Sequence, residues 1–239
     1  MTPSAHPELR GDYHVHSEFS DDAVSTIEEN IAAAVAAGLT ELRLIDHVRE
    51  STDWVPDFLA AVAAQPVPEG LTVLTGVETK VLNTAGDLDV PPDLSGIDCI
   101  VIADHQFPGP DGPWSPERTR AAIADGLSAA EATGMLVEAL NAAMTRNPGS
   151  QLAHCFSILP KVGLSENDLS DDLLRSWART AASTGTLIEV NEKWSCPSPR
   201  SLRAAADAGA RLVASTDSHV ATDVGRYDVI VALLDEARA

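Results

Sequence analysis

Short apolar runs recur along the chain, and longer stretches with apolar residues at helical spacing separate them. Runs such as LRLI, CIVIA and RLVAS are nearly continuous in apolar residues. Parallel strands that are buried on both faces have this pattern. The pattern predicts seven strands, at residues 12–17, 42–47, 71–82, 99–105, 151–156, 186–191 and 211–216.

Amphipathic stretches follow most of these strands and predict helices at residues 26–37, 54–64, 116–145, 169–182, 199–208 and 227–238. We expect Ser25 to cap the first helix, with Glu28 at the capping-box position and Gly38 at its end. Gly134 is the expected break in the long alanine-rich helical region.

Alternation of strands and helices predicts parallel βαβ units. Seven such units without a glycine-rich dinucleotide fingerprint favour an α/β barrel. No repeat or low-complexity linker divides the sequence, so residues 1–239 are expected to form one domain, with residues 1–10 as a mobile N-terminus.

Polar side chains that can bind metals gather at the ends of the predicted strands. In a parallel barrel the carboxyl ends of the strands form one face, so these groups would converge there. Six of the seven histidines belong to this set, and His6 does not. Its members are His14, His16, His47, Glu78, His105, His154, Glu189, Asp217 and His219.

Spacing within this set also indicates a metal site. His14 and His16 are one residue apart, so their side chains lie on the same face of an extended strand. Asp217 and His219 repeat that spacing at the seventh strand. Mixed histidine and carboxylate ligands suit Zn, Mn or Fe, whereas sets of oxygen ligands alone suit Mg or Ca.

Composition and charge argue against some classes of binding partner, namely long nucleic acid and membranes. The formal net charge of −20 opposes long nucleic acid as a partner, because binding of a phosphate backbone depends on Lys and Arg. No apolar run approaches the ~20 residues that span a bilayer, and residues 1–10 lack the features of a signal peptide. We therefore expect a cytoplasmic protein without membrane contact. The three cysteines are scattered along the chain and suggest no disulfide framework. The sequence leaves the oligomeric state open.

With these residues in place, the chain resembles the polymerase-and-histidinol-phosphatase (PHP) family of metal-dependent phosphoesterases. The resemblance extends from about residue 12 to residue 219, and it implies a distorted (β/α)7 barrel with the active site at the carboxyl ends of the strands. The matching segments are DYHVHSEFSDD, LRLIDHV, GVETKV, IVIADHQF, QLAHCF, GTLIEVNEK and ARLVASTDSH.

The resemblance implies two to three divalent metal ions. His14, His16, Glu78 and Asp217 would hold the first ion. Glu78 would bridge to a second ion, held by His105 and His154. Asp21, His47 and His219 would hold the third. Two positions depart from the family pattern: Asp22 stands where a Gly commonly follows the first acid, and Cys155 stands where a Pro is frequent.

Further residues are candidates for supporting roles. Asp46, Glu189 and Asn191 are candidates for orienting ligands or water from outside the metal shell. Lys193 and Arg226 are the first candidates for binding the substrate phosphate, since isolated cations near an anionic centre favour it. Lys80, Lys161 and Arg200 are weaker candidates for the same role.

The leading hypothesis is hydrolysis of a small-molecule phosphomonoester, with histidinol phosphate as one candidate substrate. The nucleophile would be a metal-bound water held at Glu78, His14, His16 and Asp217. A phosphodiesterase or exonuclease acting on nucleotides or short single strands is the alternative. A metal-binding module without chemistry and a C–N hydrolase are further hypotheses, and specificity is expected in the loops at residues 108–116 and 195–199.

Overall fold

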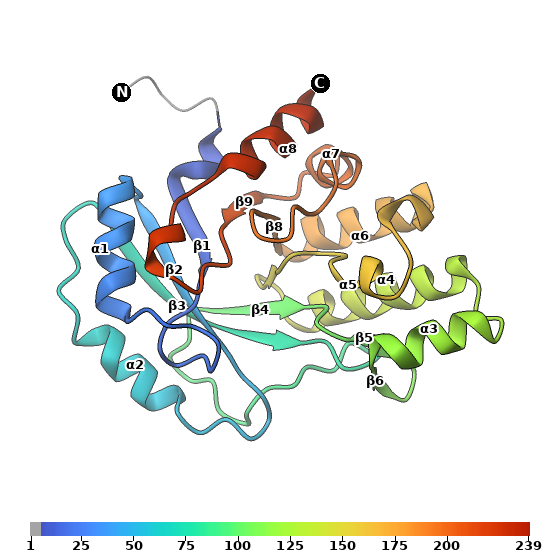
Figure 1. The fold of residues 1–239 in the computed structure, drawn as a ribbon, viewed down its shortest axis with the longest axis horizontal. Coiled ribbons are helices and arrows are strands. Elements are labelled where there is room, and N and C mark those ends of the chain that lie inside the picture. Colours follow the sequence, from blue (N-terminus) through green and yellow to red (C-terminus); the bar gives the residue numbers. More distant parts are fainter. Residues whose placement is uncertain (1–5) are drawn as a thin grey trace.

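Seven parallel strands form the centre of the computed structural model, which describes residues 6–239 (Figure 1). Neighbouring strands follow the order of the chain, and helices connect most of them on the outside. The strands are β1 (Gly11–Val15), β2 (Glu41–His47), β3 (Thr72–Lys80), β4 (Cys99–Ala103), β7 (Gln151–Leu152), β8 (Leu187–Asn191) and β9 (Leu212–Ser215).

Contacts between the first and last strands nearly close this sheet into a barrel. A parallel bridge joins Val15 to Ser218, and the His16 amide donates to the Ser218 carbonyl at 2.9 Å. The buried Asp12 carboxylate accepts from the Thr216 amide (2.9 Å) and hydroxyl (2.6 Å) and from the Gly225 amide (3.1 Å). Burial raises the pKa of Asp12 to about 6, which leaves it ionised at pH 7. The predicted seven-stranded α/β barrel is confirmed.

Eight α-helices lie among residues 6–239, and none of them is long and apolar enough to cross a bilayer. Figure 1 shows α1 and α2 on one side of the molecule and α4, α6 and α7 on the other. They are α1 (Ile27–Ala37), α2 (Val55–Ala63), α3 (Pro116–Ala124), α4 (Ala129–Arg146), α5 (Ile158–Lys161), α6 (Asp171–Thr184), α7 (Pro199–Asp207) and α8 (Asp228–Arg238). Short 3-10 helices are η1 (Pro7–Arg10), η2 (Glu166–Asp168) and η3 (Ala221–Asp223).

The largest core cluster fills the space between the sheet and α4 and α6. Trp177 of α6 is fully buried there, and its ring lies 5.1 Å from that of Phe156. Alanines are frequent on the buried face of these helices, which lets them pack closely on the strands. This explains how a chain with only 4% aromatic residues builds a continuous core.

The structure differs from the prediction after β4 and at β7. A small antiparallel hairpin, β5 (Phe107–Gly109) and β6 (Gly112–Trp114), stands where a loop was expected. The fifth strand of the barrel stops at Leu152 rather than continuing to Phe156. The backbone then turns, because His154 and Phe156 adopt positive φ angles of 27° and 71° that no strand contains.

The cap of α1 lies one residue later than expected. Thr26 accepts from the Glu29 amide, and the Glu29 carboxylate accepts from the Thr26 amide, which completes the capping box. Ser25 instead accepts from the Ala221 amide and ties this helix to the segment after β9. Gly38 ends the helix in a left-handed conformation, as predicted.

The break in the long helical region is also displaced. Gly134 lies inside α4, and the chain leaves the helix well before it, at Asp125. Gly126 there has a φ of 117°, which suits only glycine. Ser128 and Glu131 then form a capping box that starts α4. The expected break at Gly134 was wrong because local turn and cap chemistry outweighs a single helical glycine.

The N-terminal segment that was predicted to be mobile contacts the last helix in the part that can be described. Residues 1–5 lie outside the described residues. Residues 7–10 form η1, and Glu8 pairs with Arg238 at 2.9 Å. The buried His6 ring lies 3.2 Å from Asp235 in α8, so this segment is anchored to the last helix.

We expect Asp12→Ala to lower the free energy of unfolding by about 2 kcal/mol or more. The buried Thr216 amide and the Gly225 amide lose their acceptor, and a buried donor left unpaired costs ~1–3 kcal/mol. Urea denaturation followed by circular dichroism measures this change. Asp172→Ala, at a side chain that is 91% exposed, is the control and should stay within ~0.5 kcal/mol of the wild type. An equal effect of both substitutions would contradict this account of the barrel seam.

Candidate metal centre

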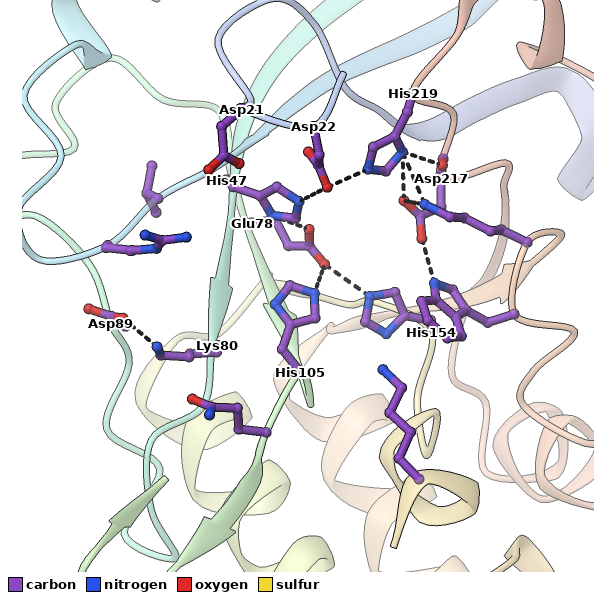
Figure 2. Close-up of a pocket in the computed structure, with 16 residues that line it drawn as sticks. Asp21, Asp22, His47, Glu78, Lys80, Asp89, His105, His154, Asp217 and His219 are labelled. Atoms are coloured by element: carbon purple, nitrogen blue, oxygen red, sulfur yellow. Dashed lines mark hydrogen bonds and ion pairs between the residues drawn. The ribbon is translucent and has the colours of Figure 1, made fainter. Parts of the chain in front are cut away.

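A cavity of about 430 Å³ opens at the carboxyl ends of the strands (Figure 2). Most of the side chains predicted for a metal site line it, and His14 and His16 lie fully buried beside it. These residues come from most of the barrel strands or from the turns after them. The predicted members that line the cavity are Asp21, His47, Glu78, His105, His154, Asp217 and His219.

Glu78 is the centre of this site. Its carboxylate is 1% exposed and lies at the inner end of the cavity, where Figure 2 shows histidines converging on it. Five imidazole nitrogens approach its two oxygens. They are His47 Nδ1 (2.9 Å), His14 Nε2 (3.4 Å) and His16 Nε2 (3.7 Å) at Oε2, and His105 Nε2 (3.0 Å) and His154 Nε2 (3.0 Å) at Oε1.

Acceptors behind the rings fix the proton on Nδ1 of two of these histidines. The Glu189 carboxylate accepts from His14 Nδ1 at 2.8 Å. The Ser20 hydroxyl donates its single proton to Asp46 at 2.6 Å, so it can only accept from His16 Nδ1, at 3.1 Å. Each Nε2 atom therefore presents a lone pair to the interior of the site when the ring is neutral.

The proton of His154 is also fixed on Nδ1, by other partners. The Ser157 hydroxyl donates to Asp104 at 2.9 Å and therefore accepts from His154 Nδ1 at 3.1 Å. His154 Nε2 is then the atom that faces Glu78.

Lone pairs that face carboxylates repel them unless a positive charge lies between the two. The Nε2 atoms of His14 and His16 are buried, and neither has a hydrogen-bond partner among the described residues. His14, His16 and Asp217 offer ligand atoms within 4.8 Å of one another, and so do His47, Glu78 and His105. A divalent ion would give the buried Nε2 atoms a partner and would place positive charge between them and the carboxylates, so the donor set fits metal binding.

The pKa shifts of the buried groups in the site are also consistent with a bound positive charge. Burial raises the pKa of Glu78, but His105 and His14 outweigh it and hold that pKa well below its usual range. Burial is the main cause that lowers the pKa of His16 to about 3. Burial also disfavours protonation of His154, but hydrogen bonding to Asp104 and Glu78 prevails and raises its pKa to about 10. Positive charge is therefore stabilised beside Glu78, whether a proton or a metal ion supplies it.

Asp22, rather than Asp21, contacts the histidines of the third predicted ion. Its Oδ2 atom lies 3.1 Å from His219 Nε2 and 3.6 Å from His47 Nε2. Burial raises the pKa of Asp22, but His47 and His219 outweigh it and lower that pKa. Asp21 lines the cavity and forms no ion pair or hydrogen bond with residues 6–239. The sequence signal that could have indicated Asp22 is the pair of consecutive acids in the SDD segment.

Backbone strain accompanies the site at two of its predicted ligands. Asp217 has a φ of 53° and His154 a φ of 27°, in a region that residues other than glycine seldom occupy. Such strain costs ~1–3 kcal/mol and persists only where the surrounding structure holds it. Trp194 helps to keep Asp217 in this conformation, since its indole nitrogen donates to Asp217 Oδ2 at 2.7 Å.

The three predicted supporting residues lie behind the ligands. Asp46 accepts from the Ser17 amide and hydroxyl and from Ser20. Glu189 accepts from Asn191 and also from Gln151 at 2.6 Å. Ser20, Asp104, Gln151 and Ser157 were not predicted, because buried polar residues at strand ends do not differ in sequence from ordinary core residues. Trp194 was not predicted either, because an exposed aromatic residue in a turn gives no signal of its contact with Asp217.

The candidate phosphate-binding cations separate into two groups. Lys193 lines the cavity, and its ammonium lies 3.2 Å from His219 Nδ1. Lys80 and Lys161 line it as well. Arg226 does not line it; its side chain is 70% exposed and pairs with Asp223. Arg226 instead lines a neighbouring pocket together with Lys193, Asp217 and His219. Arg200 binds Asp171 and carbonyls of residues 166 and 169 and lines a pocket that shares no residue with this cavity.

Comparison with known proteins assigns the family. The PHP domain model matches residues 12–193, so the chain belongs to the PHP domain family. Curated relatives named probable phosphatase include one from Shewanella sediminis (strain HAW-EB3), 26% identical over 95% of this chain and 85% of its own length. Another, from Edwardsiella ictaluri (strain 93-146), is 27% identical over 94% of this chain and 84% of its own length.

Solved structures share the fold. The histidinol phosphate phosphatase of Lactococcus lactis, solved with zinc, L-histidinol and phosphate, matches with a TM-score of 0.62 at 16% identity, over 96% of this chain and 93% of its own. A putative histidinol phosphatase of Listeria monocytogenes matches with a TM-score of 0.60 at 15% identity, over 91% and 98%. At this identity the likeness concerns the barrel.

We expect Asp22→Ala to remove about one equivalent of bound metal per chain, because its carboxylate is the one in contact with His47 and His219. Asp21→Ala is the matched control and should keep the wild-type metal content. Elemental analysis after dialysis against a weak chelator measures both. A loss confined to Asp21→Ala would show that the loop rearranges and that Asp21 is the ligand.

Proposed function

We propose that this protein is a metal-dependent phosphatase that hydrolyses a small-molecule phosphomonoester with a metal-activated water. The observation that carries the proposal is the buried Glu78 carboxylate with five imidazole nitrogens around its two oxygens, among them the buried Nε2 atoms of His14 and His16, which have no hydrogen-bond partner among the described residues. Relatives that match along most of both chains and are named probable phosphatases support the reaction class.

The proposed centre would hold two to three ions of Zn, Mn or Fe. His14, His16, Glu78 and Asp217 would hold the first, and Glu78, His105 and His154 would hold the second. His47 and His219 would hold the third with Asp22, in the place that the family resemblance gives to Asp21. Nitrogen and carboxylate donors of this kind suit all three metals.

When bound, such ions would neutralise phosphate oxygens and would supply a nucleophile by lowering the pKa of a water toward 7. The chain's own residues hold this arrangement. Glu78 presents an oxygen to each of two positions, and Glu189 and Ser20 fix the ring orientations of His14 and His16. The buried base of the site excludes bulk water, since Glu78, His14 and His16 are at most 1% exposed.

Lys193 is the residue best placed to bind the phosphate that is cleaved. The Asp217 carbonyl accepts from His219 Nδ1 at 2.9 Å, so this nitrogen has no lone pair for Lys193. The Lys193 ammonium lies 3.6 Å from Asp217 Oδ1 and 44% of its side chain is exposed. It therefore keeps protons that it can donate to a phosphate oxygen at the metals.

Replacing His14 and His16 together by Ala should reduce phosphate release by at least ~1,000-fold, which corresponds to about 4 kcal/mol of lost transition-state stabilisation. The assay follows phosphate release from phenyl phosphate with Mn or Zn supplied separately. His6→Ala is the matched control, because this histidine contacts α8, away from the cavity. Undiminished turnover in the double variant would refute the proposal, and a preference for bis-phenyl phosphate over phenyl phosphate would favour a diesterase.

A further inference from the structure

All three lysines of the chain line the same cavity. They are Lys80, Lys161 and Lys193, and they come from three separate segments. Of the thirteen arginines, only Arg49 lines it. The protein thus uses arginine as its surface cation and places its compact, strongly hydrated ammonium groups around the proposed active site.

The three ammonium groups differ in their partners. Lys80 pairs with Asp89 at 3.1 Å, which neutralises both groups. Lys193 lies beside Asp217 and His219, next to the proposed metals. Lys161 has no carboxylate partner among residues 6–239. Its ammonium lies 4.2 Å from the centroid of the Trp194 ring.

The Trp194 ring gives the Lys161 ammonium a defined place. The indole nitrogen donates to Asp217, and the Trp194 amide donates to the Asn191 side chain at 2.9 Å. The ring also lies 5.7 Å from that of His154, so Trp194 is close both to Lys161 and to a predicted ligand. A cation above a ring face is attracted by the ring and keeps its N–H donors for a ligand on its other side.

Charge then determines what this cation can bind. The chain carries 36 acidic residues against 16 Lys and Arg, so acidic partners are plentiful, and yet Lys161 pairs with none among the residues that the structure describes. Lys193 and the metals already meet the needs of the ester phosphate. Lys161 lines the same cavity, lies over the Trp194 ring and has no carboxylate partner among residues 6–239, so it is left for a second negative charge on the same substrate.

We propose that the alcohol part of the substrate carries an anionic group, a carboxylate or a second phosphate, which Lys161 binds beside the Trp194 ring. This inference rests on the proposed phosphatase function and adds the class of substrate. It also predicts discrimination against substrates whose alcohol carries an ammonium group, because Lys161 repels a like charge.

The test compares phenyl phosphate with three para-substituted analogues that carry a carboxylate, a second phosphate or an aminomethyl group. With the metal-loaded wild-type enzyme, kcat/KM should be at least ~10-fold higher for an anionic analogue than for phenyl phosphate, and lowest for the aminomethyl analogue. The better of the two anionic analogues identifies the anion.

Lys161→Met should reduce the anionic preference to about twofold or less, and Lys161→Arg should restore part of it. Arg175→Met is the control, since this side chain is 55% exposed on α6 and pairs with Asp172. Its preference should equal that of the wild type. A wild-type enzyme that does not distinguish the analogues, or a preference that survives in Lys161→Met, would overturn this inference alone. Release of phosphate from none of the analogues would refute the proposed function as well.

Discussion

A single buried carboxylate with histidines on both of its oxygens is the constraint on which this structure depends. Glu78 lies in β3, between β2 and β4, and its environment would destabilise the fold if each ring turned a neutral lone pair toward it. Burial of unpaired charge costs several kcal/mol, so the positive charge that compensates Glu78 is part of the folded state. The barrel supplies the geometry, because its parallel strands deliver residues far apart in sequence to one end.

Hydrogen bonds behind the rings make this arrangement specific. Glu189 holds His14, Ser20 holds His16, and Ser157 holds His154, each through Nδ1. Such partners orient a ligand and set which nitrogen is available to a metal. They are themselves held by further acceptors and donors, among them Asp46, Asp104 and Gln151. The site is therefore preorganised by layers of buried polar groups rather than by the histidines alone.

Much of the fold and the core of the site follow from the sequence, because both depend on simple spacing. Buried parallel strands require continuous apolar runs, and the groups that follow these runs must meet at one end of the barrel. The predicted end of the fifth strand at Phe156 was wrong, since the turn at His154 needs a positive φ that the pattern of apolar and polar residues does not indicate. The same limit applies to Asp21, the ligand that the family resemblance implies, because the geometry of the turn decides which of the two neighbouring acids reaches His219, and it is Asp22 that does so.

Residues that act through side-chain geometry could not be predicted in the same way. Lys161 was only a weaker candidate for binding phosphate, and its contact with Trp194 could not be predicted because the two residues are distant in sequence and each alone resembles an ordinary surface residue. Their contact arises because the turn after β8 and the short helix α5 meet at the rim of the cavity. Arg226, a candidate because it is an isolated cation near the last predicted ligand, does not line the cavity but lines a neighbouring pocket together with Asp217 and His219.

The most direct test of the central role of Glu78 is a crystal structure of the zinc-loaded protein with anomalous diffraction data. The account predicts at least two zinc peaks with Glu78 between them, one beside His14, His16 and Asp217 and the other beside His105 and His154, with Zn–N distances of about 2.0–2.1 Å. A map without anomalous peaks at Glu78, in which the imidazole nitrogens still contact its carboxylate directly, would contradict the account.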